Sequence, residues 1–466
     1  MKPLRLSDVA FFAGGRLHGD DLVVDALATD TRALPAHGHP LFVALKGERF
    51  DGHDHVAAAV AGGAAAVLVA REMPVAAPQV VVPDTERALA QFAAGLQRTR
   101  AGTVLAITGS NGKTSVKALL LSILSRAGSA YANPGNRNNE IGLPIAVIDA
   151  PDAADFAVYE MGAGKPGDIA YLTAVARPRV SLVNNIAPAH IERMGSLLGI
   201  ADTKAAIYDA LPADGVAVIN ADDAFAPYFA QRAHGRRLVR FGIEASADVG
   251  ARNLAPFADG EGREGTRFVL DAPEGTAMVA LPLPGRHNVR NALAAASLAL
   301  AAGAPFDAVV AGLAAAQPVA GRQLRHALRG GAVLVDDSYN ANPGSLNAAI
   351  DTLAAAPGAA WLVLGDMREL GADGAALHAE AGRRAQAAGL ARLYALGGLS
   401  AHAARAFGAQ ARTFASHEAL AQALRADLDA AATEGSAPTV LVKGSRGSAM
   451  DRVVRALLEG EAAHAA

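Results

Sequence analysis

The chain has 466 residues, a length that predicts about three domains rather than a single core. Its hydrophobic fraction of 52% against 19% charged residues is typical of a folded globular protein and excludes an intrinsically disordered chain. The 42 basic and 45 acidic residues give a net charge of −3, which excludes a general affinity for nucleic acid or anionic membrane, so an anionic ligand needs a local binding site.

The chain contains no cysteine, which excludes disulfides and thiolate metal sites and suits a reducing compartment. Residues 1–22 mix charged with apolar residues and lack the apolar segment of a signal peptide. The longest uncharged apolar stretches, residues 56–70 and 292–306, are shorter than the roughly 20 residues that span a bilayer. We therefore expect a cytoplasmic protein that is not inserted in a membrane.

The first 100 residues predict a small unit in which short strands alternate with helices. Apolar runs predict strands at 41–45, 67–69 and 80–82. Helices are expected at 53–62 and at 84–98, the second with Asp84 as its N-cap.

A second cycle begins with a buried-strand pattern at 103–107, followed by a glycine-rich turn and a helix at 114–126. Further elements follow in chain order: strands at 156–159, 180–183 and 216–219, a small antiparallel excursion within 238–282, and a helix at 288–301. Strands separated by helices predict a doubly wound, mainly parallel sheet.

A third cycle opens near residue 318, and its strands are expected at 333–335, 362–364, 393–396 and 440–442, each paired with a helix. The fold class is therefore α/β in three domains, predicted as 1–100, 101–317 and 318–466.

The strongest local pattern for chemistry lies between the strand and the helix of the second cycle, where residues 108–115 read TGSNGKTS. Glycines there let the backbone N–H groups approach phosphate oxygens at a helix N-terminus, Lys113 can neutralise phosphate charge, and Thr114 can offer a hydroxyl to Mg²⁺. The strict phosphate-loop pattern has a glycine where this chain has Ile107, and the alternative is an ordinary glycine-rich turn. The residues predicted to bind nucleotide are Gly109, Ser110, Asn111, Gly112, Lys113, Thr114 and Ser115.

Three further residues suit a metal site only as a set. Glu160 ends a strand, where parallel sheets place ligands, and a carboxylate suits Mg²⁺. His190 follows the next strand, and Lys204 lies on a helix. Each has a plain alternative, respectively a solvated strand-end charge, a structural histidine and a solvated lysine.

Polar residues also gather in the third cycle, where 336–343 read DDSYNANP after a buried strand. Carboxylates, amides and a phenol at a strand end suit recognition of a polar ligand, and an Asx-rich turn is the alternative. Arg322 and Arg325 lie just beyond the second boundary, where an arginine can reach a γ-phosphate across a cleft, although isolated arginines are usually surface residues.

Taken together and in order, these segments resemble the Mur ligases, a family of ATP-dependent amide-bond ligases, over nearly the whole chain. The resemblance implies a small amino-terminal domain that binds the UDP-sugar, a central phosphate-loop domain and a Rossmann-like carboxyl-terminal domain. The segments DTR at 30–32 and FVALKGERFDGH at 42–53 are similar to the sugar-binding domain. The substrate-binding residues that this implies are Thr31, Arg32, Lys46, Gly47, Arg49, Asp51 and His53.

The resemblance also implies roles around ATP and Mg²⁺. The implied metal residues are Thr114, Glu160, His190 and, if carbamylated, Lys204. Asn288 is implied for the adenine, Arg322 for the γ-phosphate and Asp337 for the ribose side. The implied catalytic residues are Lys113, Lys204, His190 and Arg322.

Three segments resemble the branch of the family that adds D-alanyl-D-alanine: NRNNEIG at 136–142, DSYNANP at 337–343 and LGDMRELG at 364–371. The DNPR motif typical of the branch that adds diaminopimelate is absent. This implies UDP-MurNAc-tripeptide and D-Ala-D-Ala as the substrates, an acyl-phosphate intermediate and a monomeric enzyme. The further substrate-binding residues are Asn136, Asn138, Asn139, Tyr339, Asn340 and Asn342.

Two departures from the family pattern and several alternatives remain. Thr31 replaces the more usual serine, and Ala206 stands where a glutamate is expected after Lys204. The closest alternatives are a Mur-type ligase for the third residue and folylpolyglutamate synthase. A phosphate-loop NTPase or kinase without ligation is an alternative from another class.

Overall fold

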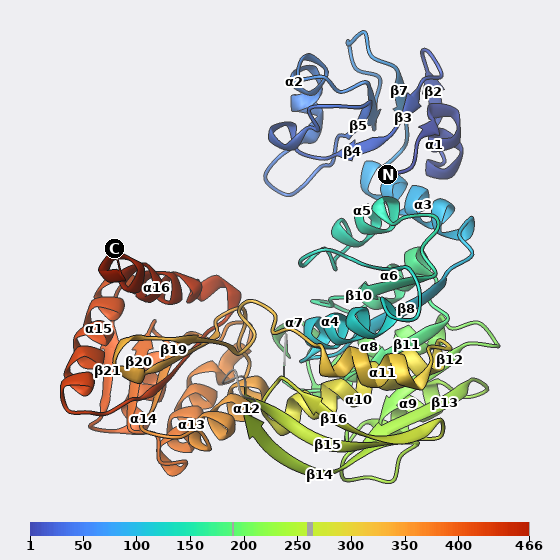
Figure 1. The fold of residues 1–466 in the computed structure, drawn as a ribbon. Helices are drawn as coiled ribbons and strands as arrows, with labels where there is room; N and C mark the ends of the chain where they lie inside the picture. The colour runs from blue at the N-terminus through green and yellow to red at the C-terminus, as the bar shows by residue number, and fades with distance from the viewer. Residues whose placement is uncertain (189–190, 259–263, 466) are drawn as a thin grey trace.

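The computed structural model describes residues 1–188, 191–258 and 264–465, and Figure 1 shows three units of α/β structure along this chain. Each unit has its own main sheet, of five, nine and six strands. The predicted α/β class with mainly parallel sheets is confirmed. No helix in the described ranges is both long and apolar enough to cross a membrane.

The amino-terminal sheet has the order β2-β7-β6-β5-β4, in which β4 to β7 run parallel and β2 is antiparallel to β7. The strands of this unit are β1 (Leu4–Arg5), β2 (Arg16–His18), β3 (Val23–Val24), β4 (Ala26–Ala28), β5 (Pro40–Val43), β6 (Ala66–Val69) and β7 (Gln79–Val81). Its α-helices are α1 (Leu6–Ala13), α2 (Val56–Ala61) and α3 (Thr85–Arg98).

The start of α3 is as predicted, because the Asp84 carboxylate accepts from the backbone N of Arg87 at 2.9 Å and so caps the helix. The helix expected at 53–62 is shorter. Its first residues form a 3₁₀ turn, Gly52–His55, whose geometry is set by the Asp51 carboxylate accepting from the backbone of His53.

The central sheet has the order β16-β15-β14-β13-β12-β11-β8-β10-β9. Its strands are β8 (Thr103–Thr108), β9 (Ala130–Ala132), β10 (Phe156–Glu160), β11 (Val180–Val183), β12 (Val216–Asn220), β13 (Arg237–Gly242), β14 (Val249–Ala258), β15 (Glu264–Ala272) and β16 (Gly275–Leu281). The last two pairings are antiparallel, so the expected excursion is a three-stranded extension of the same sheet.

Helices cover both faces of the central sheet, as a doubly wound arrangement requires (Figure 1). They are α4 (Lys113–Leu124), α5 (Gly142–Asp149), α6 (Asp168–Ala176), α7 (Ile191–Met194), α8 (Leu197–Asp209), α9 (Ala226–Arg232), α10 (Arg286–Ala301) and α11 (Phe306–Ala314). Because β8, β10, β11 and β12 are parallel neighbours, their carboxyl ends meet at one edge.

The carboxyl-terminal sheet has the order β17-β18-β22-β19-β20-β21, parallel except for β17. Its strands are β17 (Leu324–Ala327), β18 (Val333–Asp337), β19 (Ala360–Gly365), β20 (Arg392–Leu396), β21 (Ala411–Phe414) and β22 (Thr439–Lys443). Its helices are α12 (Pro343–Ala354), α13 (Gly374–Ala387), α14 (Ser400–Phe407), α15 (His417–Thr433) and α16 (Asp451–Ala465).

The amino-terminal unit packs on the central unit through α3. Leu89 and Phe92 of α3 share one buried apolar cluster with Leu143 of α5 and Ile169 of α6. Full burial of each such side chain contributes about 1.5–3 kcal/mol. The predicted boundaries near 100 and 318 lie between α3 and β8 and between α11 and β17, and they stay predictions.

Candidate functional site: two cavities joined at an arginine

The predicted phosphate loop joins the end of β8 to the start of α4 and is held by the segment after β11. The backbone N of Asn111 donates to Asn185 Oδ1 at 2.9 Å, and Ser110 Oγ donates to the carbonyl of Ala187 at 3.0 Å. Gly112 has φ 78°, and a Cβ there would lie 2.4 Å from Asn291 Oδ1. A side chain therefore does not fit at 112, and the loop keeps its backbone open to an anion at the N-terminus of α4.

Lys113 is the first residue of α4, and its Nζ donates to the carbonyl of Gly109 at 2.8 Å. Burial lowers the pKa of this ammonium, Glu160 opposes that shift and Arg322 adds to it. The positive charges of Lys113 and Arg322 repel each other, which raises the free energy of the site when no anion is bound. An arriving phosphate relieves that repulsion.

Glu160 ends β10 and lies beside the loop. Its Oε1 accepts from Asn138 Nδ2 at 2.9 Å, and its Oε2 lies 3.2 Å from Lys117 Nζ without hydrogen-bond geometry. Burial opposes its ionisation, but Lys117, Lys113 and Asn138 together hold its pKa below the usual value. Glu160 is therefore an ionised, buried carboxylate with one oxygen that lacks a hydrogen bond.

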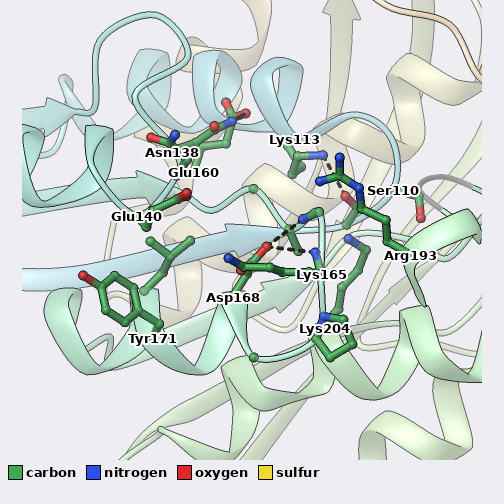
Figure 2. A pocket seen from close by; sticks show the side chains of 18 of the residues that line it. Ser110, Lys113, Asn138, Glu140, Glu160, Lys165, Asp168, Tyr171, Arg193 and Lys204 are labelled. Carbon is green, nitrogen blue, oxygen red and sulfur yellow. Dashed lines mark hydrogen bonds between the residues drawn. The ribbon is translucent and has the colours of Figure 1, made fainter. Parts of the chain in front are cut away.

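A cavity of about 540 Å³ opens between these groups, and Figure 2 shows Lys113, Glu160 and Lys204 around it. Lys204 lies on α8 and is only 2% exposed. Burial, reinforced by Lys113, lowers its pKa to about 7. The cavity thus holds an amine that can lose its proton near neutral pH, and the burial of its side chain rules out the solvated lysine considered from the sequence.

A second cavity of about 360 Å³ lies on the other side of the loop. Residues after β11, at and after the end of β12 and along α10 line it together with residues of the carboxyl-terminal unit. These include Asn184, Asn220, Asp222, Asp223, Asn288, Asp337 and Lys443. Asn288 and Asp337 thus share one cavity, as the adenine and ribose predictions require, although Lys443 Nζ already binds the Asp337 carboxylate at 2.6 Å.

Arg322 is the one residue among those described that lines both cavities. Its guanidinium carbon lies 4.2 Å from the centre of the Tyr339 ring, and its buried Nε has no hydrogen-bond partner among the described residues. An arginine at the junction, with a donor unused, can bind an anion that extends from one cavity into the other.

The carboxyl-terminal unit contacts the phosphate loop directly. Asn342 caps α12 and its Nδ2 donates to Asn111 Oδ1 at 2.7 Å. The two amides, one predicted for nucleotide and the other for substrate, bind each other in this arrangement.

Comparison with known families matches three consecutive parts of the chain. The Mur ligase family catalytic domain matches 24–97, the Mur ligase middle domain matches 107–299, and the Mur ligase glutamate ligase domain matches 321–446. The chain belongs to the Mur ligase family.

Relatives of this Mur ligase include a UDP-N-acetylmuramoyl-tripeptide–D-alanyl-D-alanine ligase of Escherichia coli (strain K12), 43% identical over 98% of this chain and 99% of the relative. A crystal structure of MurF from Acinetobacter baumannii is similar with TM-score 0.92 and 31% identity, covering 98% of this chain and 99% of the other. A folylpolyglutamate synthase of Mycobacterium tuberculosis, at 20% identity and TM-score 0.65 over 80% of this chain and 94% of the other, shares the fold alone.

A structure of MurF ligase from Thermotoga maritima was solved with ADP, and its TM-score to this chain is 0.81 at 27% identity, covering 95% of this chain and 98% of the other.

The predicted sugar-binding residues of this Mur ligase lie on the amino-terminal unit, outside both cavities. The Arg32 side chain is exposed and binds the Asp30 carboxylate, with Nη2 2.6 Å from Oδ2. His53 is buried with both ring nitrogens engaged, Nδ1 with Asp51 at 2.6 Å and Nε2 accepting from the backbone of Ala70 at 2.8 Å. Thr31, Lys46, Gly47, Arg49 and Asp51 lie in the same two loops.

Several other predicted residues stand apart from the cavities. Thr114 and Asn136 are not among the described residues that line either cavity, whereas Asn138, Asn139, Tyr339 and Asn340 line the larger one. His190 lies outside the described residues. In a separate place, Arg325 pairs with Glu264 at 2.8 Å.

Sequence reasoning missed Lys117, whose Nζ donates to the carbonyls of Asn133 and Gly135 at 2.9 and 3.1 Å as well as facing Glu160. Its spacing of one helical turn from Lys113 was the available signal. The lining residues Asn184 and Asp222 were also missed, although each follows a parallel strand, where ligands bind.

The residues fit a divalent cation in part. Glu160 offers a carboxylate oxygen without a hydrogen bond, and oxygen ligands suit Mg²⁺. Within the described residues, no three acidic, histidine or cysteine side chains form a metal-binding group. A cation held beside Glu160 would need further oxygen ligands from outside this set of side chains.

Proposed function

We propose that this Mur ligase uses ATP to join D-Ala-D-Ala to UDP-MurNAc-tripeptide, giving UDP-MurNAc-pentapeptide, ADP and phosphate. The observation that carries the proposal is the pair of cavities that meet at Arg322 beside the phosphate loop. The smaller cavity suits a nucleotide and the larger one suits an acceptor. The family and the 43% identical relative agree with both uses.

Amide formation needs activation because a carboxylate is unreactive towards an amine. In the first step, an oxygen of the tripeptide's terminal carboxylate attacks the γ-phosphorus of ATP, and the bond to the β–γ bridging oxygen breaks to release ADP. In the second step, the amine of D-Ala-D-Ala attacks the acyl-phosphate carbonyl. Phosphate then leaves with the C–O bond electrons and the amine loses a proton.

The chain's own residues supply positioning and positive charge for these steps. The N-terminus of α4 and Lys113 face the phosphates, and Arg322 faces the transferred group from the carboxyl-terminal unit. Asn288 and Asp337 line the nucleotide side. Placing three anionic groups together requires this concentration of cations, and electrostatic stabilisation is the main contribution in phosphoryl transfer.

We propose that Mg²⁺ binds beside Glu160. When bound, the ion neutralises phosphate charge and withdraws electrons from the γ-phosphoryl group. The pKa of about 7 leaves Lys204 a nucleophilic amine, which can add CO₂ with release of a proton to become a carboxylate-like carbamate. His190 stays a predicted ligand, and the monomeric state and cytoplasmic location also stay predictions.

A phosphate-loop NTPase or kinase is the second candidate class, and two observations disfavour an enzyme that only hydrolyses ATP. The acceptor-side cavity of about 540 Å³ is larger than a site for one water requires, and it is lined by residues of all three units, Glu86 of α3 among them. An enzyme that only hydrolyses ATP needs no such shared cavity.

The test incubates the purified chain with ATP, Mg²⁺ and UDP-MurNAc-tripeptide, adding D-Ala-D-Ala in one arm and a diamino acid in the other. We expect phosphate release and the pentapeptide mass with the dipeptide alone. Ligation of the diamino acid instead contradicts the assignment, and rapid ATP hydrolysis without any acceptor supports the NTPase class.

A further inference from the structure

Arg322 lies in the segment that joins the central unit to the carboxyl-terminal unit, between α11 and β17. Its backbone N donates to the carbonyl of Val319 at 2.9 Å, and it follows Gly321, which has φ 70°. The turn fixes where the side chain starts. It does not fix where the long, flexible side chain ends.

No carboxylate among the described residues forms an ion pair with Arg322. The nearby acid Asp337 binds Lys443 Nζ at 2.6 Å instead. A carboxylate partner would orient the guanidinium, but it would also neutralise the charge that a phosphate has to meet. The side chain therefore needs a support that orients it and leaves its charge available.

The Tyr339 ring is such a support. The guanidinium carbon of Arg322 lies 4.2 Å from its centre, a distance suited to a cation–π contact. The backbone that carries this ring is itself anchored, because the backbone N of Tyr339 donates to the carbonyl of Gly321 at 3.2 Å. A Cβ on Gly321 would lie 3.1 Å from Tyr339 Cβ, so the two backbones approach closely.

A second arginine contacts the same ring. The guanidinium carbon of Arg446 lies 4.9 Å from the ring centre, and the backbone N of Arg446 donates to Asn340 Oδ1 at 3.3 Å. Arg446 is not among the described residues that line either cavity. It therefore supports the ring from outside the site.

We infer that Tyr339 is a positioning residue for the terminal phosphate of ATP: its ring, supported by Arg446, holds Arg322 at the junction of the two cavities. The inference rests on the proposed function, which assigns Arg322 to that phosphate. It gives Tyr339 a different role from the substrate-binding one predicted by the sequence, of which contact with the dipeptide is the form that the test can separate. If the ring orients Arg322, its removal weakens the binding of ATP and leaves the binding of ADP unchanged. If the ring instead contacts the dipeptide, its removal changes the binding of neither nucleotide.

The test measures the dissociation constants of a non-hydrolysable ATP analogue and of ADP by titration calorimetry. Tyr339→Leu is expected to raise the dissociation constant of the analogue about 30-fold, which is about 2 kcal/mol at about 1.4 kcal/mol per decade. The dissociation constant of ADP is expected to rise by less than about twofold. Tyr339→Phe keeps the ring and is expected to keep analogue affinity within about threefold.

The matched control is Arg392→Met, which removes another arginine stacked on an aromatic ring, 4.6 Å from Trp361, far along the carboxyl-terminal sheet. It is expected to change neither dissociation constant. If Tyr339→Leu does not fold, Arg446→Met carries the test, with an expected loss of about threefold for the analogue alone.

Equal losses for the analogue and ADP, or unchanged analogue affinity with a raised KM for D-Ala-D-Ala only, would overturn the inference. A wild-type protein that binds the analogue but ligates nothing would overturn the proposed function and leave the inference standing.

Discussion

Two regions differ in how their charged side chains are buried and paired. One is the central cleft, formed by the two cavities that meet at Arg322, and the other is the amino-terminal face, formed by the loops that carry Arg32 and His53. In the cleft, Lys204 is buried and Arg322 has a buried donor without a partner in the described chain. On the amino-terminal face, Arg32 is exposed and bound to its neighbour Asp30. Buried, unsatisfied charge is costly, so its persistence points to a ligand, whereas an exposed, paired charge points to nothing by itself.

Charge burial therefore separates these two regions of the molecule. Structure alone marks the cleft as functional, but the sugar-binding role of the amino-terminal loops depends on family resemblance.

The largest effect is expected from Lys113→Met. Removing the cation at the start of α4 should lower kcat about a thousandfold or more, as loss of a preorganised transition-state donor does. Phosphate-release kinetics measure it, with unchanged circular dichroism. The control is Arg179→Met, which breaks an exposed ion pair with Asp214, and it should keep full activity. Retained turnover in Lys113→Met would remove the phosphate-loop assignment.

Lys117→Met is expected to act on stability. It leaves Glu160 buried without its nearest cation, and breaking a buried pair costs about 3 kcal/mol. Urea unfolding measures the change. Lys165→Met replaces an exposed lysine of the same cavity and should shift the free energy of unfolding by less than about 0.5 kcal/mol. Equal shifts in the two variants would show that the Lys117–Glu160 pair contributes little.

Arg32→Ala tests the amino-terminal face. If its loops bind the UDP-sugar, the KM for UDP-MurNAc-tripeptide should rise about tenfold, since a charged hydrogen bond is lost, while kcat and the KM for ATP stay constant. Steady-state kinetics with each substrate varied in turn separate these constants. Unchanged KM values would contradict the assignment of UDP-sugar binding to these loops.

The smallest effect is a pH dependence of stability from His378, which is buried in the carboxyl-terminal unit. Its Nε2 accepts from the backbone of Met367 at 2.9 Å, and burial lowers its pKa below 6.5. As pH falls below 6.5 the unfolded chain takes up the proton first, so the free energy of unfolding should fall by about 1 kcal/mol between pH 7.5 and 5.5.

Urea unfolding at the two pH values checks this result. His378→Gln should lose the corresponding part of the dependence, and replacing the exposed His234 should leave it in place. An identical pH profile in all three proteins would exclude His378 as its source.

Local patterns carried most of the fold. The cap at Asp84, the phosphate loop and the apolar strands were predictable because a few adjacent residues determine each of them. The edge strand β17 was missed because four residues, Leu324–Ala327, are defined by pairing with β18 rather than by an apolar run of their own.

The site was predictable as a set of residues but not as a set of contacts. Glu160, Lys204 and Arg322 were singled out by their positions in the sequence, and the resemblance implied their roles. The burial of Glu160 and Lys204 was not predictable, because it depends on neighbours that come from distant parts of the chain. The pairing of Asp337 with Lys443 and the stacking of Arg322 on Tyr339 likewise arise only when the carboxyl-terminal unit folds.

The hydrogen bond from the Asn342 side-chain amide to that of Asn111 joins residues 231 positions apart and crosses from one unit to the next. The backbone of Asn111 also donates to Asn185 Oδ1, so the Asn342 side chain links the carboxyl-terminal unit to a loop that the central unit holds. Any swing that separates the two units must release it. The side-chain NH₂ resonances of these asparagines would therefore act as a built-in reporter of opening, readable by NMR without an attached label.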